Sequence, residues 1–168
     1  MKKGEKWLLI GIAIFVVGMS AIRVMQYSGD KPSGDGKIPF YSDASPALRK
    51  SGHDLFKRYR CRDCHTLWTV RNVMQAVPAP AMDGIGSIRD EAWLYHYLSA
   101  EDPQSILPTR LKKEFQMPSY AHLPEKERRT LARYLASLKV QDWYLEQTRK
   151  AEFEKLTGKP YKVSRNAQ

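Results

Sequence analysis

The alternation of apolar and polar positions divides the chain into an apolar N-terminal run, a polar segment and a region of short amphipathic helices. The run "WLLIGIAIFVVGMSAI" covers residues 7–22 without a charged side chain, and Val24 and Met25 extend it past Arg23. About 19 residues make about 28 Å of helix, close to the roughly 30 Å hydrocarbon core of a bilayer. The pattern predicts a membrane anchor over residues 1–27.

A cleaved signal peptide is the alternative for this segment. Gly18 and Ser20 are small enough for a weak cleavage site, but no A-x-A pattern is present and the apolar run exceeds the usual signal core. Lys2, Lys3 and Lys6 precede the run, so the positive-inside rule keeps the N-terminus in the cytoplasm. We expect a single-pass protein of the bacterial inner (cytoplasmic) membrane, with its folded domain on the periplasmic or outer face.

The polar segment and the helical region follow the anchor. Residues 28–45, "SGDKPSGDGKIPFYSDAS", are rich in Gly, Ser, Asp and Pro and predict a linker. A loop packed on the domain through Phe40 and Tyr41 is the alternative. Helical spacing then predicts helices over about 46–60 and 90–99 and from Pro124 onward, and no strand pattern is visible. The apolar positions of these helices are Leu48, Gly52, Leu55, Phe56, Tyr59, Trp93, Leu94, Tyr97, Leu98, Leu131, Tyr134, Leu135 and Leu138.

The charge of the chain narrows the class of partner. The formal net charge is +10, and the first 25 residues carry +3, so the exported part keeps +7. A basic protein can bind nucleic acid, anionic lipid or an acidic protein. Nucleic acid is an unsuitable partner outside the membrane, and an acidic protein face fits the exported location better.

Both cysteines of the chain lie in "CRDCH", residues 61–65, and three chemistries use this spacing. Cys61 and Cys64 could cycle between dithiol and disulfide. With His65 they could also bind zinc. They could instead hold a haem through two thioethers, with His65 as an axial ligand of the iron.

The surroundings of the motif favour haem over the other two chemistries. A redox dithiol is expected at the start of a helix in a βαβ unit, whereas this motif follows a predicted helix without strands. Structural zinc needs four ligands, and the remaining histidines have no paired spacing. Three short helices also bury little apolar surface, and a large buried cofactor would supply the missing interior. We expect one covalently bound haem c.

The second axial ligand is expected to follow the motif at a distance. Met117, in "QMPSYAHLP", lies far enough from His65 for the chain to wrap around the ring, whereas Met74 would need a very tight loop. His122 is the rival ligand, and an open sixth position is the remaining alternative. Tyr120 offers a hydroxyl group to the surroundings of the cofactor.

Residues 46–139 resemble the monohaem class I c-type cytochromes. Gly52 and Phe56 match the G-x-x-x-F of the first helix of that family, and Tyr134 in "LARYLASL" matches the aromatic residue of its last helix. The resemblance implies an all-α fold, a small class I cytochrome c haem domain, in which Gly52 lets the last helix cross closely. The N-terminal transmembrane helix precedes this domain, and a C-terminal helical extension follows it over residues 140–168.

The resemblance also implies roles for residues outside the motif. The stretch "APAMDGIG" is similar to the family's G-P-x-L-x-G loop, with Ala79 in place of the first Gly. Pro80 would accept a hydrogen bond from Nδ1–H of His65, and Met82 would pack at the haem edge. Trp93 resembles the aromatic residue near a haem propionate, and "MPSY" resembles the segment that carries the distal ligand.

The ligand set predicts a carrier of single electrons and not an enzyme. His65 and Met117 would occupy both axial positions of the iron, so a substrate could bind only by displacing Met117. We expect electron transfer between respiratory-chain complexes, with a permanent subunit of a terminal oxidase, nitric oxide reductase or quinol-oxidising complex as the alternative. A gas-binding or peroxide-binding haem enzyme or sensor is a second class.

Basic residues flank the two segments that are expected to contact the haem. As a set they could steer this surface toward an acidic face of a redox partner. A solvated surface is the alternative for any single residue. The set comprises Lys57, Arg58, Arg60, Arg62, Arg110, Lys112 and Lys113.

Overall fold

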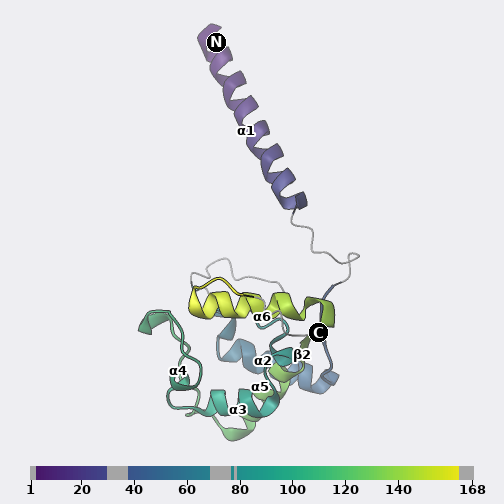
Figure 1. Cartoon of the computed structure of the whole chain (residues 1–168), viewed down its shortest axis with the longest axis vertical. Coiled ribbons are helices and arrows are strands. Elements are labelled where there is room, and N and C mark those ends of the chain that lie inside the picture. Colours follow the sequence, from purple (N-terminus) through teal and green to yellow (C-terminus); the bar gives the residue numbers. More distant parts are fainter. Residues whose placement is uncertain (1–2, 30–37, 69–76, 78, 163–168) are drawn as a thin grey trace. The chain divides into compact units, whose positions relative to one another are not determined.

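The computed structural model describes residues 3–29, 38–68, 77 and 79–162. The chain divides into two compact units, of which the first contains helix α1 (Lys3–Gly29) and the second spans Ile38–Gln168 (Figure 1). Among the residues that the structure describes, no helix has the length and apolar character needed to cross a membrane.

The second unit is mostly helical, and its described residues also form two three-residue strands. This confirms the mainly helical class predicted from the sequence and corrects the expectation of no strands. Its elements are β1 (Phe40–Ser42), α2 (Pro46–Arg58), η1 (Cys61–Asp63), η2 (Ile85–Ser87), α3 (Glu91–Ser99), α4 (Pro103–Ile106), η3 (Lys113–Phe115), α5 (Glu125–Ala136), β2 (Leu138–Val140) and α6 (Asp142–Thr157).

The three predicted amphipathic helices are α2, α3 and α5, and local side chains explain where they begin. Ser45 caps α2 by accepting a hydrogen bond from the backbone N–H of Leu48, and Pro46 occupies the first turn. Asp90 caps α3 in the same way through the N–H of Trp93, at 2.7 Å. Pro124 is the N-cap of α5, so this helix begins one residue later than predicted.

The core of the unit is the crossing of α2 and α5. Phe56 is 1% exposed and Tyr134 is 0% exposed, and their rings meet edge to face at 6.5 Å between centroids. A Cβ added to Gly52 would collide with the Tyr134 side chain. The glycine therefore permits the close approach of the two helices.

Gly52→Ala should destabilise the protein, although the same change stabilises most exposed helices. Alanine gains about 0.8–1 kcal/mol of helix propensity over glycine, but overpacking against Tyr134 should cost about 1–3 kcal/mol. Urea unfolding followed by tryptophan fluorescence measures the net effect. Ser51→Ala, at the exposed neighbouring position, is the control and should stay within about 0.5 kcal/mol of the wild type. A more stable Gly52→Ala variant would contradict the packing described here.

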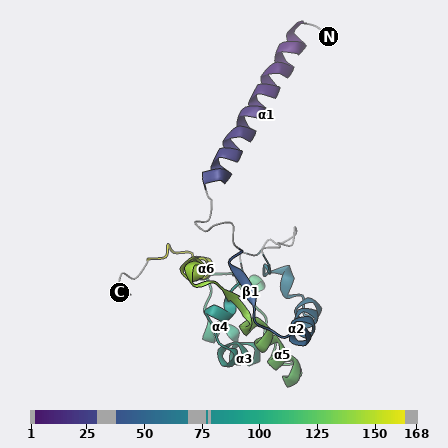
Figure 2. The ribbon, with the colours of Figure 1, turned by 90° about the vertical axis from the view of Figure 1, so that its right-hand side faces the viewer.

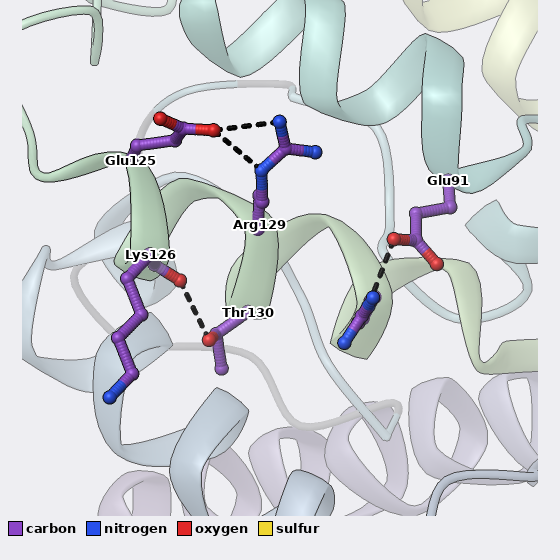
Figure 3. A network of polar contacts seen from close by, with 6 residues as sticks. Glu91, Glu125, Lys126, Arg129 and Thr130 are labelled. Atoms are coloured by element: carbon purple, nitrogen blue, oxygen red, sulfur yellow. Dashed lines mark hydrogen bonds and ion pairs between the residues drawn. The ribbon is translucent and has the colours of Figure 1, made fainter.

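Polar contacts join α3 to α5 at the surface of the unit (Figure 3). Arg133 of α5 contacts Glu91 of α3 at 3.0 Å. Arg129 pairs with Glu125 at 2.7 Å, and its guanidinium lies 4.3 Å from the ring centroid of Tyr95 on α3. Exposed pairs of this kind contribute little free energy, about 0–1 kcal/mol each, so the apolar face of α5 is the main support of the contact.

The strands β1 and β2 correct two expectations from the sequence. Phe40 pairs with Val140 and Ser42 with Leu138 in an antiparallel ladder, so part of the segment predicted as a linker is a strand of the folded unit. Leu138 was expected on the face of the last predicted helix, but it lies in β2 and is 1% exposed. Residues 30–37 of the predicted linker lie outside the described residues.

Helix α6 shows that the C-terminal extension is helical and packs back on its own domain. In both views of the ribbon it runs along the side of the unit opposite α3 and α5 (Figures 1 and 2). Glu152 contacts Arg89 at 3.3 Å, and Lys155 Nζ donates to the carbonyl of Ala79 at 3.1 Å. Gly158 ends the helix in the left-handed conformation, at φ 70°.

Candidate functional site

A largely apolar pocket lies within the second unit, and the cysteines, the preferred iron ligands and the other haem-contacting residues predicted from the sequence line it. Its non-atom space is about 1180 Å³, including the part that is open to solvent. The predicted residues that line it are Cys61, Cys64, His65, Pro80, Trp93, Met117 and Tyr120.

The end of α2 delivers the CxxCH motif to this pocket. Arg60 adopts the left-handed conformation, with φ 56°, directly after the C-cap residue Tyr59. The chain then turns so that the N–H of His65 donates to the carbonyl of Cys61 at 2.9 Å. This single turn of chain places Cys61, Cys64 and His65 on the same pocket.

The His65 ring is held by the backbone of the loop that begins at Ala79. Its Nδ1 lies 2.7 Å from the carbonyl oxygen of Pro80, which is the contact that the cytochrome resemblance implies. The carbonyl can only accept, so Nδ1 carries the proton and Nε2 is left as a neutral ligand atom. Burial lowers the pKa of His65 and outweighs the effect of the Pro80 bond. At neutral pH the ring is therefore a neutral imidazole.

The two thiols are poorly suited to act as free redox nucleophiles. Burial raises the pKa of Cys61 to about 11, and the hydrogen bond from Tyr120 only partly opposes this effect. Burial and the charge of Asp63 also raise the pKa of Cys64. Reactive cysteines have lowered pKa values, which makes the thiolate available. These thiols remain protonated at neutral pH.

Met117 reaches the pocket from a segment separate from the motif. Ser119 Oγ donates to the carbonyl of Ala100 at 2.7 Å, and the rings of Tyr120 and Tyr59 pack with centroids 6.3 Å apart. These contacts fix the chain directly after Pro118, close to Met117. The segment is thereby tied to α3 and to the residues just before the motif.

The other candidate ligands are placed differently. His122 is exposed and does not line the pocket. Met82 lines it, but the N–H of Met82 donates to the carbonyl of Thr66 at 2.9 Å, so this methionine belongs to the segment beside His65. Met74 lies outside the described residues. Of the described candidates, Met117 combines access to the pocket with an origin away from His65.

Trp93 forms part of a stacked group at the wall of the pocket. Its ring stacks on Tyr97 with centroids 5.0 Å apart, and the guanidinium of Arg89 lies 4.8 Å from the Trp93 ring centroid. Arg89 also contacts Glu152 of α6. Burial raises the pKa of Glu152, and the charge of Arg89 partly opposes this effect.

Three further residues that line the pocket were not predicted from the sequence. Glu152 and Leu156 line the pocket from α6, and Gln104 lines it from α4. Their sequence neighbourhoods contain no recognisable motif, and only the folding of the C-terminal segment onto the domain brings α6 to the site.

The lining of the pocket suits a mainly apolar group that also has a polar edge. Its walls carry leucine and aromatic side chains from α2, α3 and α5, and isoleucine and methionine side chains from the segments between these helices. Gln104 Oε1 is buried and has no hydrogen-bond partner among the described residues. A polar group of a molecule bound in the pocket could therefore donate a hydrogen bond to it. The described residues contain no group of three or more His, Cys, Asp or Glu side chains that could hold a metal ion by themselves.

Comparisons with family models, with curated proteins and with solved structures found no match to this chain.

Proposed function

We propose that the protein is a membrane-anchored monohaem c-type cytochrome that carries single electrons between respiratory-chain complexes. One observation carries the proposal. The pocket gathers both cysteines of the chain, a neutral imidazole held by a backbone carbonyl, and a methionine from a separate segment. This donor set matches the two thioether links and two axial ligands of such a haem.

Each residue of the set has one task in this proposal. Cys61 and Cys64 would hold the haem covalently, and His65 and Met117 would be its axial ligands. The bound haem would supply one-electron redox chemistry. Because His65 and Met117 would both bind the iron, the site would suit electron transfer better than catalysis on a substrate.

The alternatives for the motif are less well supported by the pocket. A dithiol catalyst needs a stabilised thiolate, whereas burial raises the pKa of both thiols. A structural zinc ion needs four ligands. Apart from the two cysteines, the residues that line the pocket around His65 are mainly apolar, so they do not complete such a site.

The membrane anchor remains part of the proposal and rests on the N-terminal sequence. The described apolar side chains of α1 include Phe15 and Val17, each 68% exposed. Large exposed apolar surfaces mark contacts with protein or membrane. The three lysines at the N-terminus then place the second unit on the periplasmic or outer face of a bacterial inner membrane.

The electron partners would bind at a basic surface beside the pocket. Arg60, Leu111 and Phe115 line the pocket, and Lys112 and Lys113 are exposed next to them. Arg58 and Arg60 form ion pairs with Glu127 and Asp63. The charges of these two arginines are therefore partly neutralised. The lysines would contribute more of the positive charge that attracts an acidic face of a partner complex.

The function is tested by charge reversal on this basic surface. A variant with Lys57→Glu, Lys112→Glu and Lys113→Glu should transfer electrons to membranes containing the partner complex at least about tenfold more slowly at low salt. Steering acts on the rate of encounter, and salt at about 0.1 M screens charges beyond about 10 Å, so the difference should shrink as salt rises. Stopped-flow absorbance measures the second-order rate constant.

The matched control carries the same charge change away from the pocket, as Lys50→Glu, Lys126→Glu and Lys150→Glu. It should slow the reaction much less, and both variants should keep the absorption spectrum of the wild type. Rates that depend on neither salt nor protein dilution would reject the mobile carrier and favour a permanent subunit of a respiratory complex. Reduced protein that binds carbon monoxide at neutral pH would instead indicate an enzyme or sensor.

A further inference from the structure

Helix α6 lies beyond the cytochrome-like region, yet its last turns contact the loops that form the pocket. Lys155 Nζ donates to the carbonyl of Ala79 at 3.1 Å. The N–H of Arg110 donates to the carbonyl of Leu156, also at 3.1 Å. Glu152 pairs with Arg89, next to the cap of α3. The helix therefore joins three loops that are far apart in the sequence.

The loop from Ala79 to Met82 determines how His65 is oriented, and it is held at both ends. At one end the N–H of Met82 donates to the carbonyl of Thr66 at 2.9 Å. At the other end Ala79 is 6% exposed and accepts from Lys155. Between them the carbonyl of Pro80 accepts from Nδ1 of His65 at 2.7 Å. A shift of the loop would therefore turn or release the imidazole.

Lys155 also brings a positive charge to this side of the pocket. Its Nζ lies 3.1 Å from the carbonyl oxygen of Ala79, a residue that lines the pocket. The side chain is only partly exposed, so water screens its charge incompletely. A cation near a redox centre disfavours the oxidised form, which carries one more positive charge.

We propose that Lys155 is a positioning residue for His65, which holds the loop that orients the imidazole and raises the reduction potential of the site through its charge. This inference rests on the proposed function. It concerns the segment beyond residue 139, which is not part of the cytochrome-like region.

The test compares Lys155→Met, Lys155→Gln and Lys155→Arg in the full-length holoprotein. A unit charge acting over roughly 10 Å at the effective dielectric constant of a protein changes an equilibrium by up to about tenfold. Lys155→Met and Lys155→Gln should therefore shift the ratio of oxidised to reduced protein, at a fixed solution potential, by about three- to tenfold toward oxidised. Tenfold corresponds to about 59 mV for one electron. Lys155→Arg keeps the charge and should stay within about twofold of the wild type.

Lys150→Met is the matched control, because it removes one lysine charge from an exposed position of the same helix. Its potential should equal that of the wild type. NMR signals of the His65 ring should move in Lys155→Met and stay in place in Lys150→Met, which separates positioning from a general loss of charge. Equal potentials and equal His65 signals in the two variants would overturn the inference.

A measurement on the wild type covers the case in which Lys155→Met does not accumulate. In the oxidised holoprotein the ε-methylene protons of Lys155 should be shifted by the paramagnetic centre, whereas those of Lys150 should resonate at ordinary positions. Ordinary chemical shifts for the Lys155 ε-methylene protons would overturn this inference and leave the proposed function intact. A wild-type chain that takes up no haem would overturn the proposed function and this inference with it.

Discussion

Replacing both Cys61 and Cys64 with alanine should abolish covalent haem attachment and leave the second unit without a stable fold. The thioethers need both sulfurs, and the double variant offers none. The pocket that the haem would fill is lined by side chains of α2, α3, α5 and α6. Leu94, Leu98 and Leu131 both line that pocket and belong to the buried core. Without an occupant these side chains would face an unfilled space, and unfilled space in a core destabilises a fold.

Mass spectrometry of denatured protein measures the attachment, and circular dichroism measures the fold. The protein should be produced in a host that has the machinery for cytochrome c assembly. The wild type should exceed the mass of the polypeptide by one haem, and Cys61→Ala should keep at most one thioether. Met82→Leu changes a pocket residue that is not expected to be a ligand, and it should retain the full mass. Wild-type protein at the bare polypeptide mass, with both thiols free, would contradict the proposed function.

The sequence predicted the helices of the core because their apolar positions repeat at helical spacing. Gly52, Phe56 and Tyr134 lie at the crossing of α2 and α5, where the resemblance led us to expect them. Their burial depends on a pattern that each helix carries in its own sequence. Such elements can be recognised without knowledge of the rest of the fold.

The strands could not be predicted, because each has only three residues and its partner lies far away in the chain. Phe40 pairs with Val140, and three residues are too few to establish an alternating pattern. Leu138 was therefore counted as a helical position although it belongs to β2. The left-handed turn at Arg60 was also not predicted, because the chain leaves α2 there without the glycine that usually signals such a turn.

The site could be predicted only where a local motif or the family resemblance identified its residues. The motif named Cys61, Cys64 and His65, and the resemblance named the carbonyl of Pro80. Glu152 and Lys155 are charged residues in a helix of mixed character, and their sequence alone resembles a solvated surface. They reach the pocket through contacts with Arg89 and Ala79, and these contacts exist only in the folded chain.

Replacing Met117 with alanine should have the second-largest effect, on the potential and on the access of small ligands to the site. Met117 is the described methionine that enters the pocket from a segment separate from His65. Axial ligands set haem potentials over a range of about 0.8 V, and a thioether favours the reduced form. Met117→Ala should shift the ratio of oxidised to reduced protein by about a hundredfold or more toward oxidised. The reduced variant should also bind carbon monoxide, whereas the wild type should not.

Optical spectroscopy checks the ligand directly. Oxidised wild-type protein should show the weak sulfur-to-iron absorption band of His/Met ligation in the far red, and Met117→Ala should lose it. Met82→Ala and His122→Ala are the matched controls. Met82 lies on the segment beside His65, and His122 is exposed away from the pocket, so both variants should keep the band. Loss of the band in either control, with its retention in Met117→Ala, would assign the distal ligand to that residue and show that the Met117 assignment is wrong.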